Sequence, residues 1–307
     1  MSAPAPDAPT GRGGFAIVAG LLRTARPKQW VKNVLVLAAP VAAGRVGEVP
    51  VLLDALVAFV AFSLVASSVY LVNDAVDVEA DRAHPTKRNR PIAAGIVPVP
   101  AAYAASGVFF VAALAVSMLA GWPLLVVIAL YWAVQLAYCF GLKHQTVIDL
   151  CIVASGFLMR AIAGGVAAEI FLTQWFYLVF TFGSLFMVSG KRYAEIMLFE
   201  KTGAKIRSSL KKYSASYLRF VWATAAAALI MSYSLWAFDI QQGLTQATSG
   251  SSWAVVSIVP FVVAVLRYAV DVDGGNAGEP EEIALRDRVL QVLGLTWVIT
   301  LTLSVYL

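Results

Sequence analysis

Long apolar runs, each near the length of a membrane-spanning helix, constrain this chain more than any other feature. A helix needs about 20 apolar residues to cross the hydrocarbon core of a bilayer. Nine segments approach or reach that length, and Pro, Gly and polar turns separate them. They are residues 31–44, 50–72, 98–120, 122–140, 147–168, 172–190, 217–238, 253–270 and 289–306. The first segment is short, so a chain with eight spans is the alternative.

The composition agrees with a membrane protein and excludes other classes. Apolar residues make up 60% of the 307 residues and charged residues only 13%, whereas soluble domains have roughly 45–50% and about 25%. Two cysteines cannot form a disulfide scaffold, and the sparse basic residues do not suit a nucleic-acid partner despite a net charge of +5. We therefore predict an all-α, polytopic membrane protein with about nine transmembrane helices.

The chain begins with a segment of different composition. Residues 1–14 are rich in Ala, Pro and Gly, and we expect them to form a disordered tail. The apolar stretch 15–25 is too short to cross a bilayer and ends in basic residues, which predicts an interfacial helix. Residues 15–307 are expected to form one transmembrane domain.

The basic residues predict the orientation of the spans. If the N-terminus is placed in the cytoplasm, all but two of the 23 Lys and Arg residues fall in inside segments; the exceptions are Arg45 and Arg160. The positive-inside rule expects this asymmetry. The long loops 73–97, 191–216 and 271–288 lie on the same side. We therefore predict a multi-pass protein of the inner (plasma) membrane, with its N-terminus and a polar cavity facing the cytoplasm.

An acidic motif ends the second span. Asn73, Asp77 and Asp81 are spaced four residues apart, so on a helix each is turned by about 40° and lies about 6 Å from the next. Carboxylates stacked in this way repel one another unless a cation lies among them, and oxygen ligands of this kind suit Mg²⁺. We predict a Mg²⁺ site formed by these three residues, with Asp74 as a catalytic neighbour. The alternative is a solvated acidic end of a helix.

A basic loop, residues 82–91, follows the acidic motif directly. A Mg²⁺–diphosphate needs carboxylates for the ion and Lys or Arg for the remaining phosphate oxygens. Lys87 and Arg90 are therefore candidate substrate-binding residues. A loop that only sets the membrane topology is the alternative.

The motif Asn73-Asp74-x-x-Asp77-x-x-x-Asp81, placed after a transmembrane helix, resembles the first aspartate-rich motif of the UbiA superfamily of intramembrane prenyltransferases. The pattern of spans extends the resemblance over nearly the whole chain. It implies a UbiA-like helical bundle with a cytoplasm-facing polar cavity, and it makes residues 15–307 a catalytic domain.

The chain departs from that superfamily at the second aspartate-rich motif, which holds a second metal ion. Glu195 is present, but Phe199 stands where its acidic partner is expected. Many cations surround these positions instead, an arrangement that suits a substrate with more phosphate than a prenyl diphosphate. They are Lys191, Arg192, Lys201, Lys205, Arg207, Lys211 and Lys212.

One branch of this superfamily resembles the chain in particular, the decaprenyl-phosphate phosphoribosyltransferases of actinobacterial cell-wall synthesis. The resemblance lies in residues 26–33, 191–195 and 278–288. The resemblance implies that phosphoribosyl pyrophosphate with Mg²⁺ is the donor and that a polyprenyl phosphate lipid is the acceptor. The products would be decaprenylphosphoryl-5-phosphoribose, a precursor for arabinan in arabinogalactan, and pyrophosphate.

Two other functions compete with this interpretation. A UbiA-type prenyltransferase would move an isoprenoid from its diphosphate to an aromatic acceptor, and it shares the first motif. An anion transporter is disfavoured, because transporters place their charged groups near the middle of the bilayer, whereas the charges here crowd one rim.

Side chains outside the acidic motif are candidates for phosphate and ribose. Arg160 lies deep in the fifth span, where a charge is costly and often functional; it could meet the lipid phosphate, although a structural role is favoured. A homo-oligomer is possible. The remaining candidates are Lys191 and Tyr193 as catalytic residues, and Lys28, Glu195 and Lys205 as substrate-binding residues.

Overall fold

The computed structural model describes residues 14–202, 210–247, 253–275, 283 and 286–306. Every regular element in these ranges is an α-helix or a 3₁₀-helix, which confirms the all-α prediction. The chain forms two compact units. The first consists of Met1–Val34 and Leu56–Phe140, and the second of Leu35–Ala55 and Gly141–Leu307.

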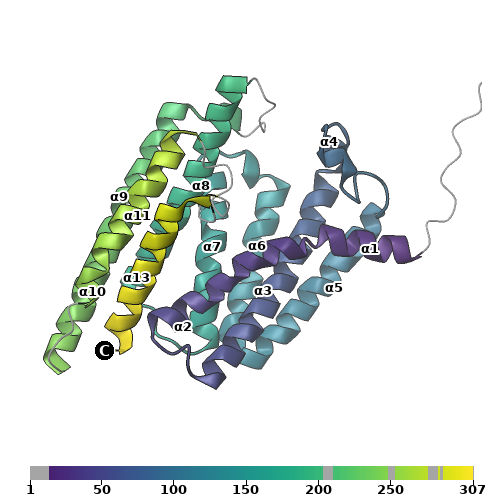
Figure 1. The fold of residues 1–307 in the computed structure, drawn as a ribbon. Coiled ribbons are helices and arrows are strands. Elements are labelled where there is room, and N and C mark those ends of the chain that lie inside the picture. Colours follow the sequence, from purple (N-terminus) through teal and green to yellow (C-terminus); the bar gives the residue numbers. More distant parts are fainter. Residues whose placement is uncertain (1–13, 203–209, 248–252, 276–282, 284–285, 307) are drawn as a thin grey trace, which may run out of the picture. The chain divides into compact units, whose positions relative to one another are not determined.

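The first unit is built on the second half of a long helix and a helical hairpin. Leu71, Ala75 and Ile92 are buried in its core. Helices α5 and α6 run side by side (Figure 1), and Gly121, with φ 94°, makes the turn between them. The elements are α1 (Gly14–Thr24), η1 (Pro27–Leu37), α3 (Val49–Val76), α4 (Val78–Arg82), η2 (Lys87–Asn89), α5 (Val99–Ser117), η3 (Met118–Ala120) and α6 (Trp122–Phe140).

The segment before α3 differs from the predicted span at 31–44. It forms the 3₁₀-helix η1 and then the short helix α2 (Ala38–Ala42), so no single α-helix covers the candidate. Trp30 Nε1 donates to Ser67 Oγ at 3.1 Å, which ties η1 to α3. Pro40 would also leave a continuous helix without one backbone hydrogen bond. The predicted helix at 15–25 is α1, which begins at Gly14; residues 1–13 of the predicted tail lie outside the described residues.

The second unit packs around α7 and α8. Phe186, Tyr193 and Leu218 lie in its buried core. Gly164 of α7 packs closely against the backbone of Val36, since a Cβ at position 164 would lie 1.6 Å from the Val36 carbonyl oxygen. Figure 1 shows α11 between α9 and α13. The other elements are η4 (Leu142–His144), α7 (Ile148–Ala167), α8 (Gln174–Thr202), η5 (Leu210–Lys212), α9 (Ala215–Ala247), α10 (Trp253–Val256), α11 (Ile258–Asp273) and α13 (Arg288–Tyr306).

Within the described residues, six helical segments are long and apolar enough to cross a membrane. The chain is therefore an integral membrane protein. The prediction of nine spans is not confirmed, because α8 continues beyond the candidate 172–190 into the charged segment 191–202 and the apolar part of α13 is shorter than a span. The six segments are Val49–Val76, Val99–Ala120, Trp122–Phe140, Ile148–Ala167, Ala215–Asp239 and Trp253–Asp273.

Candidate functional site

The acidic motif lies at the junction of α3 and α4. Helix α3 ends at Val76, and Asp77 precedes the first residue of α4. The Asp77 N–H donates to the Asn73 carbonyl at 3.0 Å, and the Asp81 N–H donates to the Asp77 carbonyl at 2.8 Å. The backbone therefore keeps the spacing of a helix across the junction at Asn73, Asp77 and Asp81.

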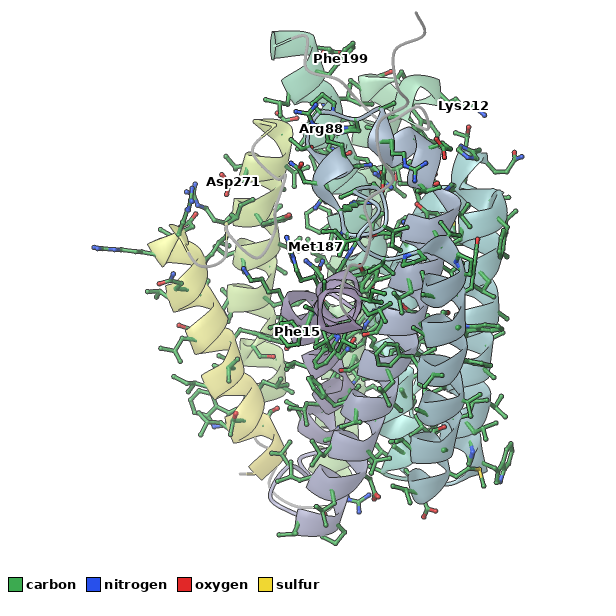
Figure 2. The ribbon with its side chains drawn as sticks, turned by 90° about the vertical axis from the view of Figure 1, so that its right-hand side faces the viewer. Phe15, Arg88, Met187, Phe199, Lys212 and Asp271 are labelled. Atoms are coloured by element: carbon green, nitrogen blue, oxygen red, sulfur yellow. The ribbon has the colours of Figure 1, made fainter. Side chains whose placement is uncertain are left out.

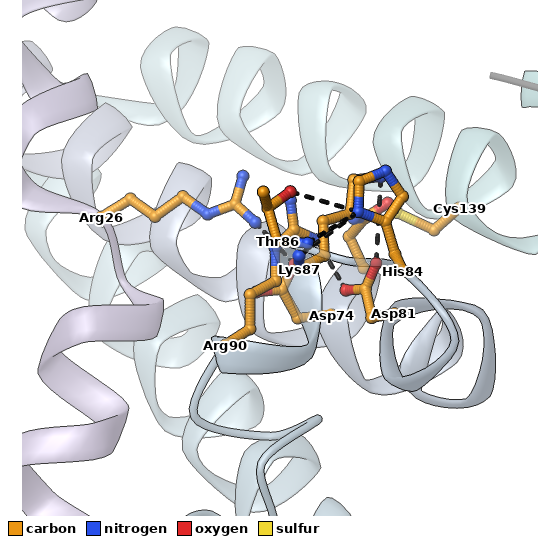
Figure 3. A network of polar contacts seen from close by, with 9 residues as sticks. Arg26, Asp74, Asp81, His84, Thr86, Lys87, Arg90 and Cys139 are labelled. Carbon is orange, nitrogen blue, oxygen red and sulfur yellow. Dashed lines mark hydrogen bonds and ion pairs between the residues drawn. The ribbon is translucent and has the colours of Figure 1, made fainter. Parts of the chain in front are cut away.

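Two carboxylates of the motif are buried and paired with cations (Figure 3). Arg90 Nη1 lies 2.7 Å from Asp81 Oδ2 and 3.1 Å from Asp74 Oδ1. Arg26 Nη2 lies 2.6 Å from the same Asp74 oxygen, and Lys87 Nζ lies 3.9 Å from Asp81 Oδ1. We call these five residues the Asp74 cluster. It places both predicted cations of the basic loop on the acidic motif, and it adds Arg26, which the sequence interpretation missed.

The predicted metal ligands fit a hard cation. Asn73 Oδ1 accepts a weak hydrogen bond from the Cys139 thiol at 3.6 Å, and an amide oxygen has a second lone pair. Asp81 Oδ1 has a long contact of 3.9 Å with Lys87 Nζ. One amide and two carboxylates are ligand types that Mg²⁺ uses in proteins. Among the residues described, no three His, Cys, Asp or Glu side chains come together at a metal site.

The predicted residues of α8 lie in the second unit, where the charges are arranged differently. Arg192 is buried, and its Nη1 lies 3.5 Å from Glu195 Oε2. Its Nη2 lies 3.9 Å from Asp149 Oδ2 of α7. The side chains of Lys191 and Glu195 are half-buried. The positive charge of Arg192 on α8 is thus balanced by Asp149 and Glu195.

Tyr193 is buried in the core of the second unit. Its hydroxyl accepts a hydrogen bond from Arg219 Nη2 at 2.6 Å, and the guanidinium lies over its ring. Arg219 also lies 3.1 Å from Asp273 Oδ1. The predicted catalytic tyrosine therefore contacts a cation of α9, 26 residues away in the sequence, and no local pattern in the sequence indicates that contact.

A second buried polar contact joins the start of α7 to η5. The Tyr213 hydroxyl donates to Asp149 Oδ1 and accepts from the Val147 N–H at 2.7 Å. Val147 has φ 72°, which is strained for a β-branched residue. Burial, and then the bond to Asp149, raise the pKa of the Tyr213 phenol above its ordinary value. Lys212 donates to the His144 carbonyl at 2.8 Å. Figure 2 shows Lys212 and Phe199 toward the same end of this unit.

The other predicted residues are distributed over both units. Lys28 is exposed on η1, two residues after Arg26 in the chain. Arg160 is buried in α7, where its Nη1 donates to the Gly156 carbonyl at 2.6 Å. Lys205 and the segment 276–282 lie outside the described residues.

Six membrane-length helices, with paired acids and arginines at the end of one of them, define an integral membrane protein with a charged site suited to phosphate. The model of the UbiA prenyltransferase family matches residues 34–285, and the chain belongs to this family.

Two relatives and one solved structure extend this result. The chain is 59% identical over 297 residues to the decaprenyl-phosphate phosphoribosyltransferase of Mycolicibacterium smegmatis, which covers 94% of this chain and 93% of that protein. It is 58% identical to the enzyme of the same name from Mycobacterium tuberculosis, over 94% and 95%. A UbiA homolog from Archaeoglobus fulgidus, solved with DMAPP and Mg²⁺, has the same fold, with a TM-score of 0.69 at 15% identity over 93% of this chain and 99% of that one.

Proposed function

We propose that this chain is a Mg²⁺-dependent phosphoribosyltransferase that transfers 5-phosphoribose from phosphoribosyl pyrophosphate to decaprenyl phosphate. The observation that carries the proposal is the identity of 58–59% to two enzymes of that name, over more than nine-tenths of every chain compared. The Asp74 cluster supports it, because it combines oxygen ligands with several cations at one helix end. The product would supply arabinan synthesis in the cell wall.

The transfer replaces one bond at the sugar. A phosphate oxygen of the lipid attacks the anomeric carbon of ribose, the bond from that carbon to the pyrophosphate oxygen breaks, and pyrophosphate leaves. A phosphate monoester is already a competent nucleophile, so the reaction needs no strong general base. The protein has to hold both substrates in line and stabilise the charge on the leaving group.

The residues around the acidic motif suit the leaving group. Asn73, Asp77 and Asp81 would hold Mg²⁺, which when bound neutralises charge on the diphosphate. Lys87 and Arg90 bind phosphate oxygens through charge-assisted hydrogen bonds. The acids that contact these two cations in the structure keep them beside the metal ligands.

The remaining candidates serve the rest of the substrates. Glu195 binds a ribose hydroxyl, and Tyr193 orients Arg219 through the hydroxyl contact. Arg160 binds at the lipid phosphate if that group enters the bundle. Lys28, Lys191 and Lys205 bind further phosphate oxygens.

The topology follows from the solubility of the donor. Phosphoribosyl pyrophosphate is a charged, soluble molecule, so the site opens to the cytoplasm, as the distribution of Lys and Arg indicates. In this proposal residues 15–307 form one catalytic domain of about nine helices in the plasma membrane, with a cytoplasmic N-terminus. The proposal is compatible with a homo-oligomer as well as with a monomer.

Transfer of label tests the proposal. Membranes that contain the protein are incubated with decaprenyl phosphate and phosphoribosyl pyrophosphate labelled in the ribose. We expect lipid-extractable label that requires the added lipid and disappears with EDTA. A parallel reaction contains a labelled isoprenyl diphosphate and an aromatic acceptor. Label in the aromatic product, with none transferred from the phosphoribosyl donor, would instead identify an ordinary prenyltransferase.

A further inference from the structure

Arg26 has a strained backbone that the surrounding structure holds in place. It lies between α1 and η1 with φ 53°, in the left-handed region, which is unfavourable for a residue with a Cβ. Its guanidinium contacts two side chains that are one turn apart on α3. The guanidinium carbon lies 4.8 Å from the centre of the Tyr70 ring, and Nη2 lies 2.6 Å from Asp74 Oδ1.

One buried oxygen binds two arginines. Asp74 Oδ1 contacts both Arg26 Nη2 and Arg90 Nη1, at 2.6 and 3.1 Å. The Asp74 side chain is only 3% exposed, whereas those of Arg26 and Arg90 are 30% and 27% exposed. The carboxylate therefore forms the inner layer and the two guanidinium groups the outer layer (Figure 3).

The outer layer has donors for another anion. A guanidinium carries five N–H donors in a planar fork, and the bond from Arg26 to Asp74 uses Nη2. Arg90 also pairs with a second acid, Asp81, at 2.7 Å, and Lys87 shares that acid. The three cations of the Asp74 cluster therefore share its two carboxylates, which leaves one positive charge in excess within the cluster. A phosphate group, with several oxygens and up to two negative charges, matches paired guanidinium groups.

We propose that Arg26 is a further phosphate-binding residue and that Asp74 is a positioning residue, whose buried carboxylate presents Arg26 and Arg90 as a pair. The inference deepens the proposed function and rests on it for the identity of the substrates. The phosphate belongs either to the soluble sugar donor or to the lipid acceptor, and both present the same chemistry to the arginines.

Binding in detergent tests the role of Arg26 without turnover. The melting temperature of the full chain is followed in titrations with Mg²⁺–pyrophosphate and, separately, with a short-chain polyprenyl phosphate. We expect Arg26→Gln to weaken the binding of one probe by about 10- to 100-fold, the effect of losing a charge-assisted hydrogen bond. The probe that is affected identifies the source of the phosphate.

Arg23 supplies the matched control. It lies in the last turn of α1, is exposed, and carries the same charge. Arg23→Gln is expected to bind both probes like the wild type. If Arg26→Gln also binds both probes like the wild type, the inference is wrong.

Kinetics test the positioning role of Asp74. Asp74→Asn removes the charge but keeps the size, and we expect it to raise the KM for the same substrate as Arg26→Gln by about tenfold, with a smaller change in kcat. The loss in the double variant should be smaller than the two single losses combined, since both changes break the contact between Arg26 and Asp74. An unchanged KM with a lowered melting temperature would show a purely structural role and overturn the proposal.

Two further measurements keep the tests separate. If Asp74→Asn does not fold, Arg26→Lys is measured in its place. This change keeps the positive charge but removes the forked donors of the guanidinium group, so we expect a KM between those of the wild type and Arg26→Gln. A wild-type KM would overturn the proposal. If wild-type membranes transfer no label from phosphoribosyl pyrophosphate, the proposed function fails, while the pyrophosphate titration still decides the role of Arg26.

Discussion

The two units each place acids and arginines near one end of a long helix, but with different layering. At the end of α3 the carboxylates of Asp74 and Asp81 are buried, and Arg26 and Arg90 form the more exposed layer. On α8 the cation is buried together with an acid: the side chains of Arg192 and Asp149 are 7% and 2% exposed, and Arg192 also contacts the partly exposed Glu195. The same residue types therefore build an outward-facing set of cations in one unit and an inward-facing cation in the other.

The difference in exposure between these arginines indicates which of them can bind a substrate and which stabilise the fold. A partly exposed guanidinium held by a buried carboxylate can meet an incoming phosphate without first losing its partner. A buried guanidinium that lost its acids would leave a charge without compensation, which is costly. We infer that the first cluster serves the substrate directly, whereas Arg192 mainly holds α7 and α8 together.

The largest expected effect is at the metal ligands of the first unit. Asp77→Ala should lower the transfer of label by about 100-fold or more, as expected when a group that stabilises the leaving charge is lost. Glu79→Ala is the control, because Glu79 is exposed two residues away and pairs with the exposed Arg82. Near-normal turnover by Asp77→Ala would remove the acidic motif from the mechanism.

The next effect concerns the packing of the second unit. Gly164→Ala places a methyl group against the Val36 carbonyl, and backbone cannot move aside as a side chain can. We expect a loss of about 3 kcal/mol or more of stability, measured as a lower melting temperature or no folded protein in detergent. In the first unit, Gly107 of α5 has open space. Gly107→Ala should be neutral or slightly stabilising, and equal effects of the two changes would contradict the packing described here.

The spacing of residues along the sequence made the local structure of the acidic motif and the basic loop predictable. Asn73, Asp77 and Asp81 keep the spacing of a helix because backbone hydrogen bonds four residues apart continue through the break at Asp77. Arg90 of the basic loop lies beside Asp81, since only a few residues separate the two and the chain turns back there. Helix periodicity and short loops are properties of the sequence alone.

Contacts between distant residues could not be predicted in this way. Arg26 and Asp74 are 48 residues apart, and Arg219 and Tyr193 are 26 apart. Charge patterning treats each of these arginines as a topology signal. The predicted span at 31–44 failed for a similar reason, because side chains of α3 hold η1 in place through hydrogen bonds that hydropathy does not register.

A smaller effect is expected at the buried contact between Tyr213 and Asp149. Tyr213→Phe removes a donor to a buried carboxylate, which should cost about 1.5–3 kcal/mol and lower the melting temperature. Tyr217→Phe is the control, since Tyr217 stacks on Tyr213 from a more exposed position. An unchanged melting temperature in Tyr213→Phe would contradict a supporting role.

The same variant predicts a dependence on pH. Because the pKa of Tyr213 is raised in the folded protein, its contribution to stability is fully present below the ordinary phenol value of about 10 and falls as the pH rises further. The difference in melting temperature between the wild type and Tyr213→Phe should therefore shrink between about pH 9 and pH 11. A difference that grows over this range would contradict the direction of the shift.

The smallest effect is expected at the hydroxyl of Tyr193. If it acts by orienting Arg219, Tyr193→Phe and Arg219→Gln should each lower kcat/KM by about three- to tenfold, the value of one hydrogen bond. The double variant should then be no worse than Arg219→Gln, because both changes remove the same contact. Tyr177→Phe on the same helix serves as the control. Additive losses, or a loss from Tyr193→Phe that Arg219→Gln does not share, would show that the phenol acts on the substrate itself. Either result would contradict the contrast between the Asp74 cluster, which binds the substrate, and the supporting polar contacts of the second unit.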